Sequence, residues 1–196
     1  MTFYDVAVVG AGPAGATAAL LLARAGYDVL LLDRDGFPRD KACGGALLPD
    51  ATAVLARLGL DDRVREHGHE VAAASFYSPG GVEMRVPGSF VTLPRRVFDK
   101  LLVDAAIDAG ASFQQVRVRH LHTTADAGVR LGSRRAPERF AARVAVLATG
   151  WRLRLARQLG MAAAAAAPTA YACSSIVQAD LDVPRMMFAL SPQVRT

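Results

Sequence analysis

A glycine-rich turn near the start of the chain constrains the fold more than any other feature. The apolar run Tyr4–Val9 leads into Gly10-Ala11-Gly12-Pro13-Ala14-Gly15, which opens an alanine- and leucine-rich helix. A second apolar run, Tyr27–Leu32, ends at Asp33. This order of strand, glycine turn, helix, strand and terminal acid is typical of a βαβ unit whose helix N-terminus faces a pyrophosphate. The sequence therefore predicts part of a dinucleotide-binding enzyme.

The residue types of this turn suit contact with a dinucleotide. Gly10 permits the tight turn, Gly12 lets the backbone approach the pyrophosphate, and Gly15 lets the helix pack close to the strand. Pro13 stands near the helix start, where a missing N–H costs nothing. Asp33 can accept hydrogen bonds from ribose hydroxyls, and its charge disfavours a 2′-phosphate at this site. The predicted cofactor-binding residues of this unit are Gly10, Gly12, Pro13, Ala14, Gly15, Asp33 and Arg34.

The helix after the turn carries small apolar side chains at helical spacing. Ala16, Ala19, Leu20 and Ala23 are predicted to face the sheet, and Gly26 is predicted to end the helix in a left-handed conformation. The motif alone does not separate FAD from NAD, so the choice of cofactor depends on the residues that follow.

The loop after Asp33 favours FAD. In place of another crossover helix it reads Phe37-Pro38-Arg39-Asp40-Lys41-Ala42-Cys43-Gly44-Gly45, and a helix is predicted from about Pro49 to Leu58. The P-R-x-K-x-C-G-G form resembles FAD-dependent reductases and monooxygenases of the group that includes geranylgeranyl reductases, aromatic hydroxylases and flavin halogenases. It looks most like the geranylgeranyl reductase branch, because halogenases usually carry a G-E-S type sequence here.

By this resemblance, the loop residues Arg39, Lys41, Cys43 and Gly44 bind or approach the flavin. Cys43 is the candidate catalytic residue, and its neighbours Lys41 and Arg39 could lower the pKa of its thiol. The alternative, that Cys43 is a small residue that merely fits the loop, stays equally open.

The resemblance continues at Arg95-Arg96-Val97-Phe98-Asp99-Lys100-Leu101-Leu102, which is similar to the family's R-x-x-F-D-x-x-L helix start. It implies that Arg95 faces the flavin region. Helical spacing predicts a buried helix face made of Phe98, Leu101, Leu102, Ala105 and Ala106. After a helix end at Gly110, a strand is predicted from Ser112 to Leu121, and the resemblance implies that Val118 contacts the adenine through its backbone.

A strand at Ala141–Ala148 leads into Thr149-Gly150, the position of the family's second flavin motif. The family's commoner form is A-D-G followed by a serine and an arginine, whereas this chain has Thr149, Leu153 and Ala156 at those places. Thr149 and Gly150 are still predicted to bind the cofactor, but the hydrogen bonds around them are expected to differ from those of the commoner family form.

Family members are about twice as long and carry a later G-D motif, which nothing after Gly160 matches. We therefore expect the N-terminal half of such an enzyme, whether a truncated product, a proteolysed fragment or a gene remnant. The predicted fold is α/β: a doubly wound, mostly parallel Rossmann-like FAD-binding sheet with part of a β-rich substrate domain. The FAD-binding domain is assigned to residues 1–70 and 95–165, and the incomplete substrate domain to 71–94 and 166–196.

Within the second domain, Ser78-Pro79-Gly80-Gly81 predicts a turn between two strands. Further strands are predicted at Thr169–Val177 and Arg185–Leu190. A hairpin turn is predicted at Asp126-Ala127-Gly128, and a helix end or linker at Ala162–Ala167.

Charge and composition limit the partners. The net charge of +5 comes almost entirely from scattered arginines without aromatic interleaving, so no nucleic-acid partner is predicted. Two arginine clusters are interpreted as solvated faces: Arg134-Arg135-Arg139-Arg143 and Arg152-Arg154-Arg157. No signal segment precedes the first strand and no apolar run reaches about 18 residues, so we expect a cytoplasmic location. Peripheral membrane contact stays open, because isoprenoid substrates live in membranes.

Cysteines and histidines give little support for other chemistry. Cys43 and Cys173 are too few for a disulfide framework or a structural zinc site. The histidine pairs His67 with His69 and His120 with His122 provide only two ligands each, so no metal site is predicted.

The resemblance implies an FAD-dependent oxidoreductase in which reduced flavin delivers hydride to an alkene of an isoprenoid or other apolar substrate. NAD(P)H or another protein would supply the electrons. Two alternatives stay open: a flavin-dependent monooxygenase of the hydroxylase type, and a catalytically inactive dinucleotide-binding fragment. We expect the 196-residue chain alone to hold FAD weakly and to self-associate through the apolar strands at Tyr171–Val177 and Met186–Leu190.

Overall fold

The computed structural model describes residues 2–124, 128–161 and 186–189. The chain divides into two compact units, residues 1–39 with 99–167 and residues 40–98 with 168–196. Residues 40–70, which we assigned to the FAD-binding domain, therefore share a unit with the predicted substrate domain. The functional assignment of these residues to the cofactor stays a prediction.

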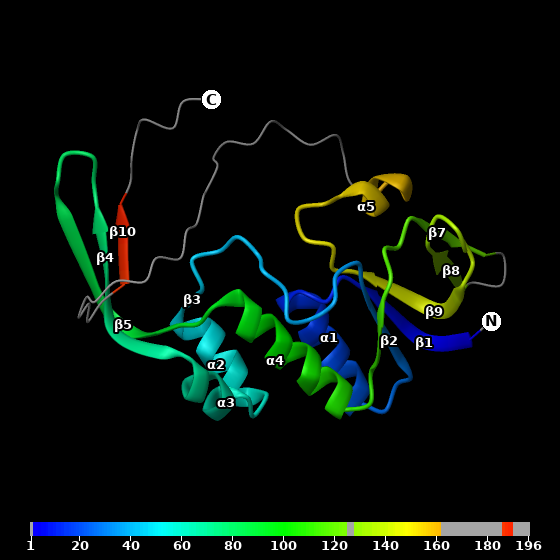
Figure 1. The fold of residues 1–196 in the computed structure, drawn as a ribbon, viewed down its shortest axis with the longest axis horizontal. Coiled ribbons are helices and arrows are strands. Elements are labelled where there is room, and N and C mark those ends of the chain that lie inside the picture. Colours follow the sequence, from blue (N-terminus) through cyan, green and yellow to red (C-terminus); the bar gives the residue numbers. More distant parts are fainter. Residues whose placement is uncertain (1, 125–127, 162–185, 190–196) are drawn as a thin grey trace. The chain divides into compact units, whose positions relative to one another are not determined.

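The first unit is built on a six-stranded sheet in the order β6-β2-β1-β9-β8-β7. Four strands run parallel: β6 (Ser112–Gln115), β2 (Val29–Asp33), β1 (Thr2–Val9) and β9 (Phe140–Leu147). Two more continue it antiparallel: β8 (Val129–Gly132) and β7 (His120–Thr123). Figure 1 shows this arrangement. The α/β class with a mostly parallel Rossmann-like sheet is confirmed.

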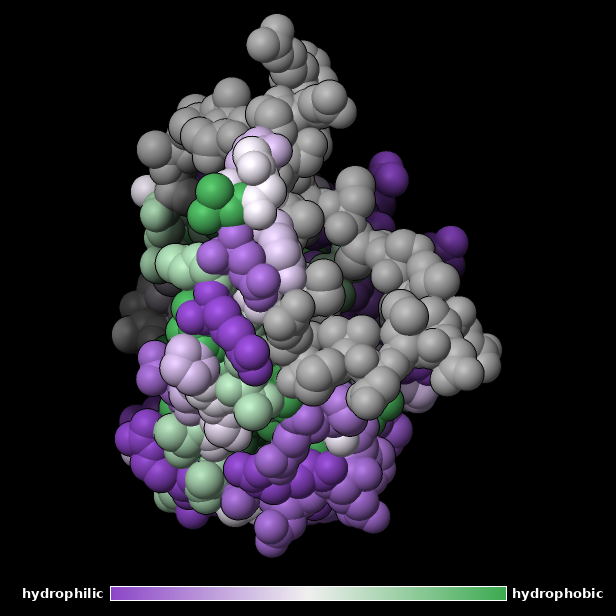
Figure 2. Space-filling model, turned by 90° about the vertical axis from the view of Figure 1, so that its left-hand side faces the viewer, coloured by the Kyte–Doolittle hydropathy of each residue, from purple (hydrophilic) through white to green (hydrophobic). Residues whose placement is uncertain are grey.

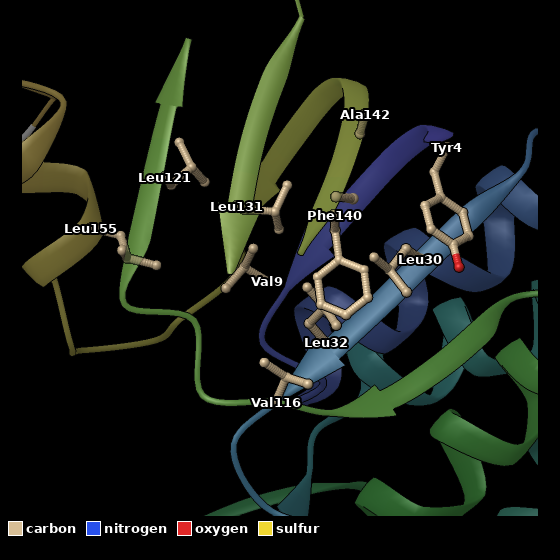
Figure 3. Close-up of a cluster of buried hydrophobic side chains, with 11 residues drawn as sticks. Tyr4, Val9, Leu30, Leu32, Val116, Leu121, Leu131, Phe140, Ala142 and Leu155 are labelled. Carbon is tan, nitrogen blue, oxygen red and sulfur yellow. The ribbon is translucent and has the colours of Figure 1, made fainter. Parts of the chain in front are cut away.

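One face of this sheet carries a buried hydrophobic cluster (Figure 3). Side chains from β1, β2 and β9 meet others from β7, β8 and the short helix α5 (Arg154–Gln158). The labelled members are Tyr4, Val9, Leu30, Leu32, Val116, Leu121, Leu131, Phe140, Ala142 and Leu155. Since strand side chains alternate, the fully buried Val8, Val29 and Leu31 face the other side, where the first helix packs.

That helix is α1 (Pro13–Arg24), the crossover between β1 and β2. Its predicted sheet-facing side chains, Ala16, Ala19, Leu20 and Ala23, are all buried, as is Gly15. Gly26 ends it with φ +86°, and the N–H of Gly26 donates to the Ala23 carbonyl at 2.9 Å. The predicted helix face and helix end are both confirmed.

The second unit contains a four-stranded sheet in the order β10-β4-β5-β3. Its strands are β3 (Ala46–Leu47), β4 (His69–Tyr77), β5 (Glu83–Thr92) and β10 (Met186–Ala189). The helices α2 (Pro49–Arg57) and α3 (Asp61–His67) lie between β3 and β4 in the chain. The predicted helix near 49–58 and the strand near 185–190 are confirmed. β10 pairs in parallel with β4.

β4 and β5 form an antiparallel hairpin closed at the predicted turn, where the N–H of Gly81 donates to the Ser78 carbonyl at 3.0 Å. The hairpin exposes Val82, Met84 and Val86. Figure 2 views the molecule from the side on which Figure 1 draws this hairpin, and apolar residues there are interspersed with hydrophilic ones.

Helix α4 (Arg95–Asp108) begins in the second unit and continues into the first. Its five predicted core side chains are all buried: Phe98, Leu101, Leu102, Ala105 and Ala106. Gly110 follows with φ +106°. The helical spacing of the sequence therefore predicted both the buried face of this helix and its end.

The continuous strand predicted from Ser112 to Leu121 is wrong. The chain leaves β6 after Gln115, and residues 116–119 form a loop before β7. Val116 still donates its N–H to the Asp33 carbonyl at 2.7 Å while its side chain joins the buried cluster. Arg119 then pairs its N–H with the Gly132 carbonyl at 2.8 Å. The chain changes partner from β2 to β8 here, which apolar alternation cannot reveal.

β7 and β8 form the predicted hairpin. Its turn residues 125–127, the segment 162–167 and the strand predicted at Thr169–Val177 lie outside the described residues.

Candidate cofactor-binding site

The three glycines of the turn differ in the space around them. A Cβ on Gly10, which has φ +107°, would lie 2.3 Å from the Ala148 carbonyl oxygen. A Cβ on Gly15 would lie 1.7 Å from the Gly10 carbonyl oxygen. At Gly12 the only neighbour within 4 Å of a Cβ, among the described residues, is Nη2 of Arg39, at 3.8 Å. Gly10 and Gly15 are thus required by close backbone packing, whereas Gly12 faces open space.

Helix α1 starts at this open position. Gly12 is its N-cap residue with φ −72°, Pro13 follows, and neither a side-chain cap nor an acidic residue occupies the first turn. Ala14 is exposed on this turn. The first N–H groups of a helix lack partners within the helix, and its N-terminus carries partial positive charge. The turn therefore leaves donors and a favourable field for an anion.

The Asp33 carboxylate ties the end of β2 to the turn. Its Oδ2 accepts the Ala11 N–H at 2.7 Å, and its Oδ1 accepts the Asp35 N–H at 3.0 Å. Sequence reasoning missed this structural role. Each carboxylate oxygen can accept a further hydrogen bond, so the predicted contact with a ribose stays compatible with the geometry. Arg34 pairs its Nε with Asp35 Oδ2 at 3.0 Å.

Arg39 lies beside the turn in the same unit. Its Nη2 is 3.1 Å from Oδ2 of the fully buried Asp99. Its Cζ lies 5.0 Å from the centre of the Phe37 ring. Its Nε is buried, and within the described part of the chain no acceptor reaches that atom. The structure thus brings a predicted loop residue to the glycine turn and leaves its Nε without a partner among the described residues.

The second predicted motif also adjoins the turn. The Ala148 N–H donates to the Val9 carbonyl at 2.8 Å, and the Thr149 nitrogen would lie 3.1 Å from a Cβ on Gly10. The Thr149 hydroxyl donates to the Arg152 carbonyl at 2.8 Å, and Gly150 has φ +64°. The Thr149 side chain therefore stabilises the loop that follows it, and this hydrogen bond is a structural role for the polar side chain.

The remaining predicted residues are not brought to the turn by any contact within one unit. Lys41, Cys43 and Gly44 lie exposed in the loop before β3, and Arg95 is half-buried in the first turn of α4. All four belong to the second unit, and their approach to a flavin stays a prediction. Val118 is half-buried against the hydrophobic cluster of the first unit, and its predicted adenine contact is likewise untested.

Arg119 lies near arginines from both of the clusters that we interpreted as solvated faces. The pKa of the Arg119 guanidinium lies below its ordinary value, through desolvation first and then through repulsion by Arg154, Arg117, Arg134 and Arg152. Arg152 also lies over the Trp151 ring, with its Cζ 5.1 Å from the ring centre.

The described residues offer neither a metal site nor a membrane-spanning helix. There, no group of three or more histidines, cysteines and acids lies close enough together to hold a metal ion. In that same part of the chain, every helix is too short or too polar to cross a lipid bilayer.

Comparison with known proteins agrees with the geometry of the turn. The sequence profile of a family described as an FAD binding domain matches residues 3–191. A menaquinone reductase from Mycolicibacterium smegmatis is 46% identical over 119 residues, which cover 56% of this chain and 28% of the relative. Digeranylgeranylglycerophospholipid reductase 2 from Methanopyrus kandleri is 36% identical over 164 residues, which cover 81% of this chain and 40% of the relative. The chain thus spans less than half the length of these relatives.

Solved structures share the fold. The flavin-dependent brominase Bmp2 superposes with a TM-score of 0.71 at 22% identity, over 82% of this chain and 41% of that one. The flavin-dependent monooxygenase PieE, solved with FAD and substrate, superposes with a TM-score of 0.65 at 28% identity, over 81% and 32% of the two chains.

Proposed function

The chain belongs to the family of FAD-binding domains, and on that premise we propose that it holds the adenosine diphosphate half of FAD against the glycine turn. The observation that carries this proposal is the open space at Gly12, which adjoins Arg39, whose buried Nε has no partner in the described part of the chain. Among the described residues, backbone fills the space at Gly10 and Gly15, whereas the position of a Cβ on Gly12 is open. The residues present therefore fit a diphosphate.

In this arrangement each group has a defined task. The first-turn N–H groups of α1 and the Arg39 guanidinium donate to diphosphate oxygens. The Asp33 carboxylate accepts from a ribose hydroxyl while still holding Ala11. Thr149 and Gly150 border the same turn. These residues bind and orient, and FAD supplies the redox chemistry when bound.

We assign the whole enzyme as an FAD-dependent oxidoreductase that reduces an alkene of an isoprenoid or other apolar substrate. The names of two relatives, menaquinone reductase and digeranylgeranylglycerophospholipid reductase, support this substrate class. NAD(P)H or an electron-transfer protein would supply the electrons. We further propose that the enzyme is cytoplasmic, that it contacts a membrane peripherally and that it self-associates. Lys41, Cys43, Gly44 and Arg95 are assigned to the flavin end on the resemblance alone.

The second candidate is a flavin-dependent monooxygenase. The superposition on the monooxygenase PieE favours it. A third candidate is a dinucleotide-binding chain without catalytic activity.

The experiment has two stages. FAD is titrated into the chain while flavin fluorescence and absorbance are followed, with Gly12→Val as the paired variant. The unaltered chain is expected to bind FAD saturably. Gly12→Val is expected to abolish this binding, because a branched side chain would occupy the diphosphate position. Equal binding by both would refute the assignment of the turn.

The natural gene product, reduced in the absence of air, is then mixed with a polyprenyl substrate or with oxygen. The reductase is expected to yield a product with two additional hydrogen atoms. The monooxygenase would instead be identified by two results together: the substrate accelerates the reoxidation of the flavin by oxygen, and the product is hydroxylated. A gene product that binds FAD and reacts with neither would identify the inactive chain.

A further inference from the structure

An ion pair with a fully buried carboxylate joins two distant parts of the first unit. Asp99, in α4, has no exposed surface, and its Oδ2 lies 3.1 Å from Nη2 of Arg39, whose side chain is 13% exposed. Burying two charges costs desolvation free energy that their attraction barely offsets, so such a pair is a poor source of stability. Its presence therefore needs another explanation.

The pair fixes the guanidinium in place together with an aromatic ring. Phe37 lies under Arg39, with the Cζ atom 5.0 Å from the ring centre. The Phe37 ring is itself held edge-on by Phe113 of β6, with centroids 5.7 Å apart and an interplanar angle of 76°. An arginine that is stacked on one side and paired with a carboxylate at one nitrogen loses most of its rotamer freedom before any ligand binds.

One N–H donor of the fixed guanidinium, at Nε, is not used by these contacts. Within the described residues, the buried Nε of Arg39 has no hydrogen-bond partner. A buried donor without a partner is costly, and an incoming anionic oxygen would satisfy it. The Nη2 atom lies 3.8 Å from the position of a Cβ on Gly12, where the turn is open. The Arg39 guanidinium is thus close to the place proposed for the diphosphate.

We infer that Asp99 and Phe37 are positioning residues that hold Arg39 beside Gly12 so that it meets the diphosphate of a bound adenine dinucleotide without reorganisation. This inference rests on the proposed function and adds two residues to it. Asp99 touches Arg39 and acts through it.

The experiment measures binding of ADP and of adenosine to the full 196-residue chain by calorimetry. The variants are Asp99→Asn, Arg39→Met and the double variant. The matched control is Asp104→Asn, the same exchange on the same helix, because Asp104 pairs with Lys100 at 2.6 Å and not with Arg39. Asp99→Asn is expected to weaken ADP binding roughly tenfold and to leave adenosine binding unchanged. When Arg39 is already replaced by Met, Asp99→Asn should have no further effect on ADP binding, because Asp99 then has no guanidinium to position.

Several outcomes would overturn the inference. Equal loss of ADP and adenosine binding would show that Asp99 merely supports the fold, and an undiminished effect in the Arg39→Met background would show that it does not act through Arg39. If Asp99→Asn does not fold, Phe37→Leu keeps the ion pair and should still weaken ADP selectively. Unchanged ADP binding in Phe37→Leu would then refute the inference. Failure of the unaltered chain to bind ADP would refute the proposed function as well, whereas binding that no variant changes would refute only this assignment.

Discussion

Gly15→Ala is expected to destabilise the chain even though alanine is the better helix former. Gly15 lies in the first turn of α1, and a Cβ there would stand 1.7 Å from the Gly10 carbonyl oxygen and 3.0 Å from the Ala148 Cβ. Real Cβ atoms do not approach other heavy atoms within 3.0 Å. No flexible side chain is available to move aside, so the backbone of the turn itself must shift.

The size of the effect follows from two opposing terms. Overpacking a well-packed site costs about 1–3 kcal/mol, and a clash with backbone belongs at the upper end. Replacing glycine by alanine in a helix returns roughly 1 kcal/mol. The net loss is therefore about 2 kcal/mol. For a chain of this length each kcal/mol changes the Tm by about 2–4 °C, so we expect a decrease of roughly 4–8 °C.

The assay is thermal unfolding followed by circular dichroism, with Gly12→Ala as the control. Within the part of the chain that the structure describes, a Cβ on Gly12 meets only Nη2 of Arg39 at 3.8 Å, so this control should leave the Tm within about 1 °C. It should weaken ADP binding instead, because the methyl group enters the space proposed for the diphosphate. A Gly15→Ala chain as stable as the unaltered one, or a Gly12→Ala chain equally destabilised, would refute the distinction between the two glycines.

Three further changes separate structural from functional roles. Asp33→Asn should lower stability by about 1–2 kcal/mol, measured by urea unfolding, because the Ala11 and Asp35 N–H groups bond to different oxygens of Asp33 and the asparagine NH2 would face one of them; unchanged stability would show that these bonds contribute little. Gly26→Ala should cost about 1 kcal/mol in the same assay, since the residue has φ +86°, and an unchanged midpoint would contradict this. Cys43→Ser in the natural gene product should reduce turnover more than it reduces Tm, and equal activity would make Cys43 a residue that merely fits its loop.

Local patterns in the sequence predicted the elements formed by neighbouring residues. The glycine turn, the buried face of α1 and the end of that helix at Gly26 all depend on residues close together in the chain. The same is true of the core face of α4. Spacing rules describe such elements well, because side chains of one helix or strand face share a fixed period.

Interactions between distant segments could not be predicted in this way. The Arg39–Asp99 ion pair joins a loop to a helix from another part of the chain, and no period connects them. The break at residues 116–119 arises because the backbone exchanges its partner from Asp33 to Gly132. The hydrogen bonds from Ala11 and Asp35 to Asp33 were missed for a different reason: a carboxylate at the end of a strand was interpreted only as a ligand for ribose.

The central position of β1 has a consequence for the order in which the chain is made. On one edge β1 pairs with β2, which follows within the first 33 residues, but on the other edge it pairs with β9. Arg143 of β9 bonds to Asp5 of β1 across 138 residues of sequence. At about 5–20 residues per second, a ribosome needs roughly 7–28 s to cover that distance. For that time the second edge of β1 offers unpaired backbone groups to any neighbouring strand, so the speed of translation between the two strands sets how long the nascent chain is open to wrong pairing.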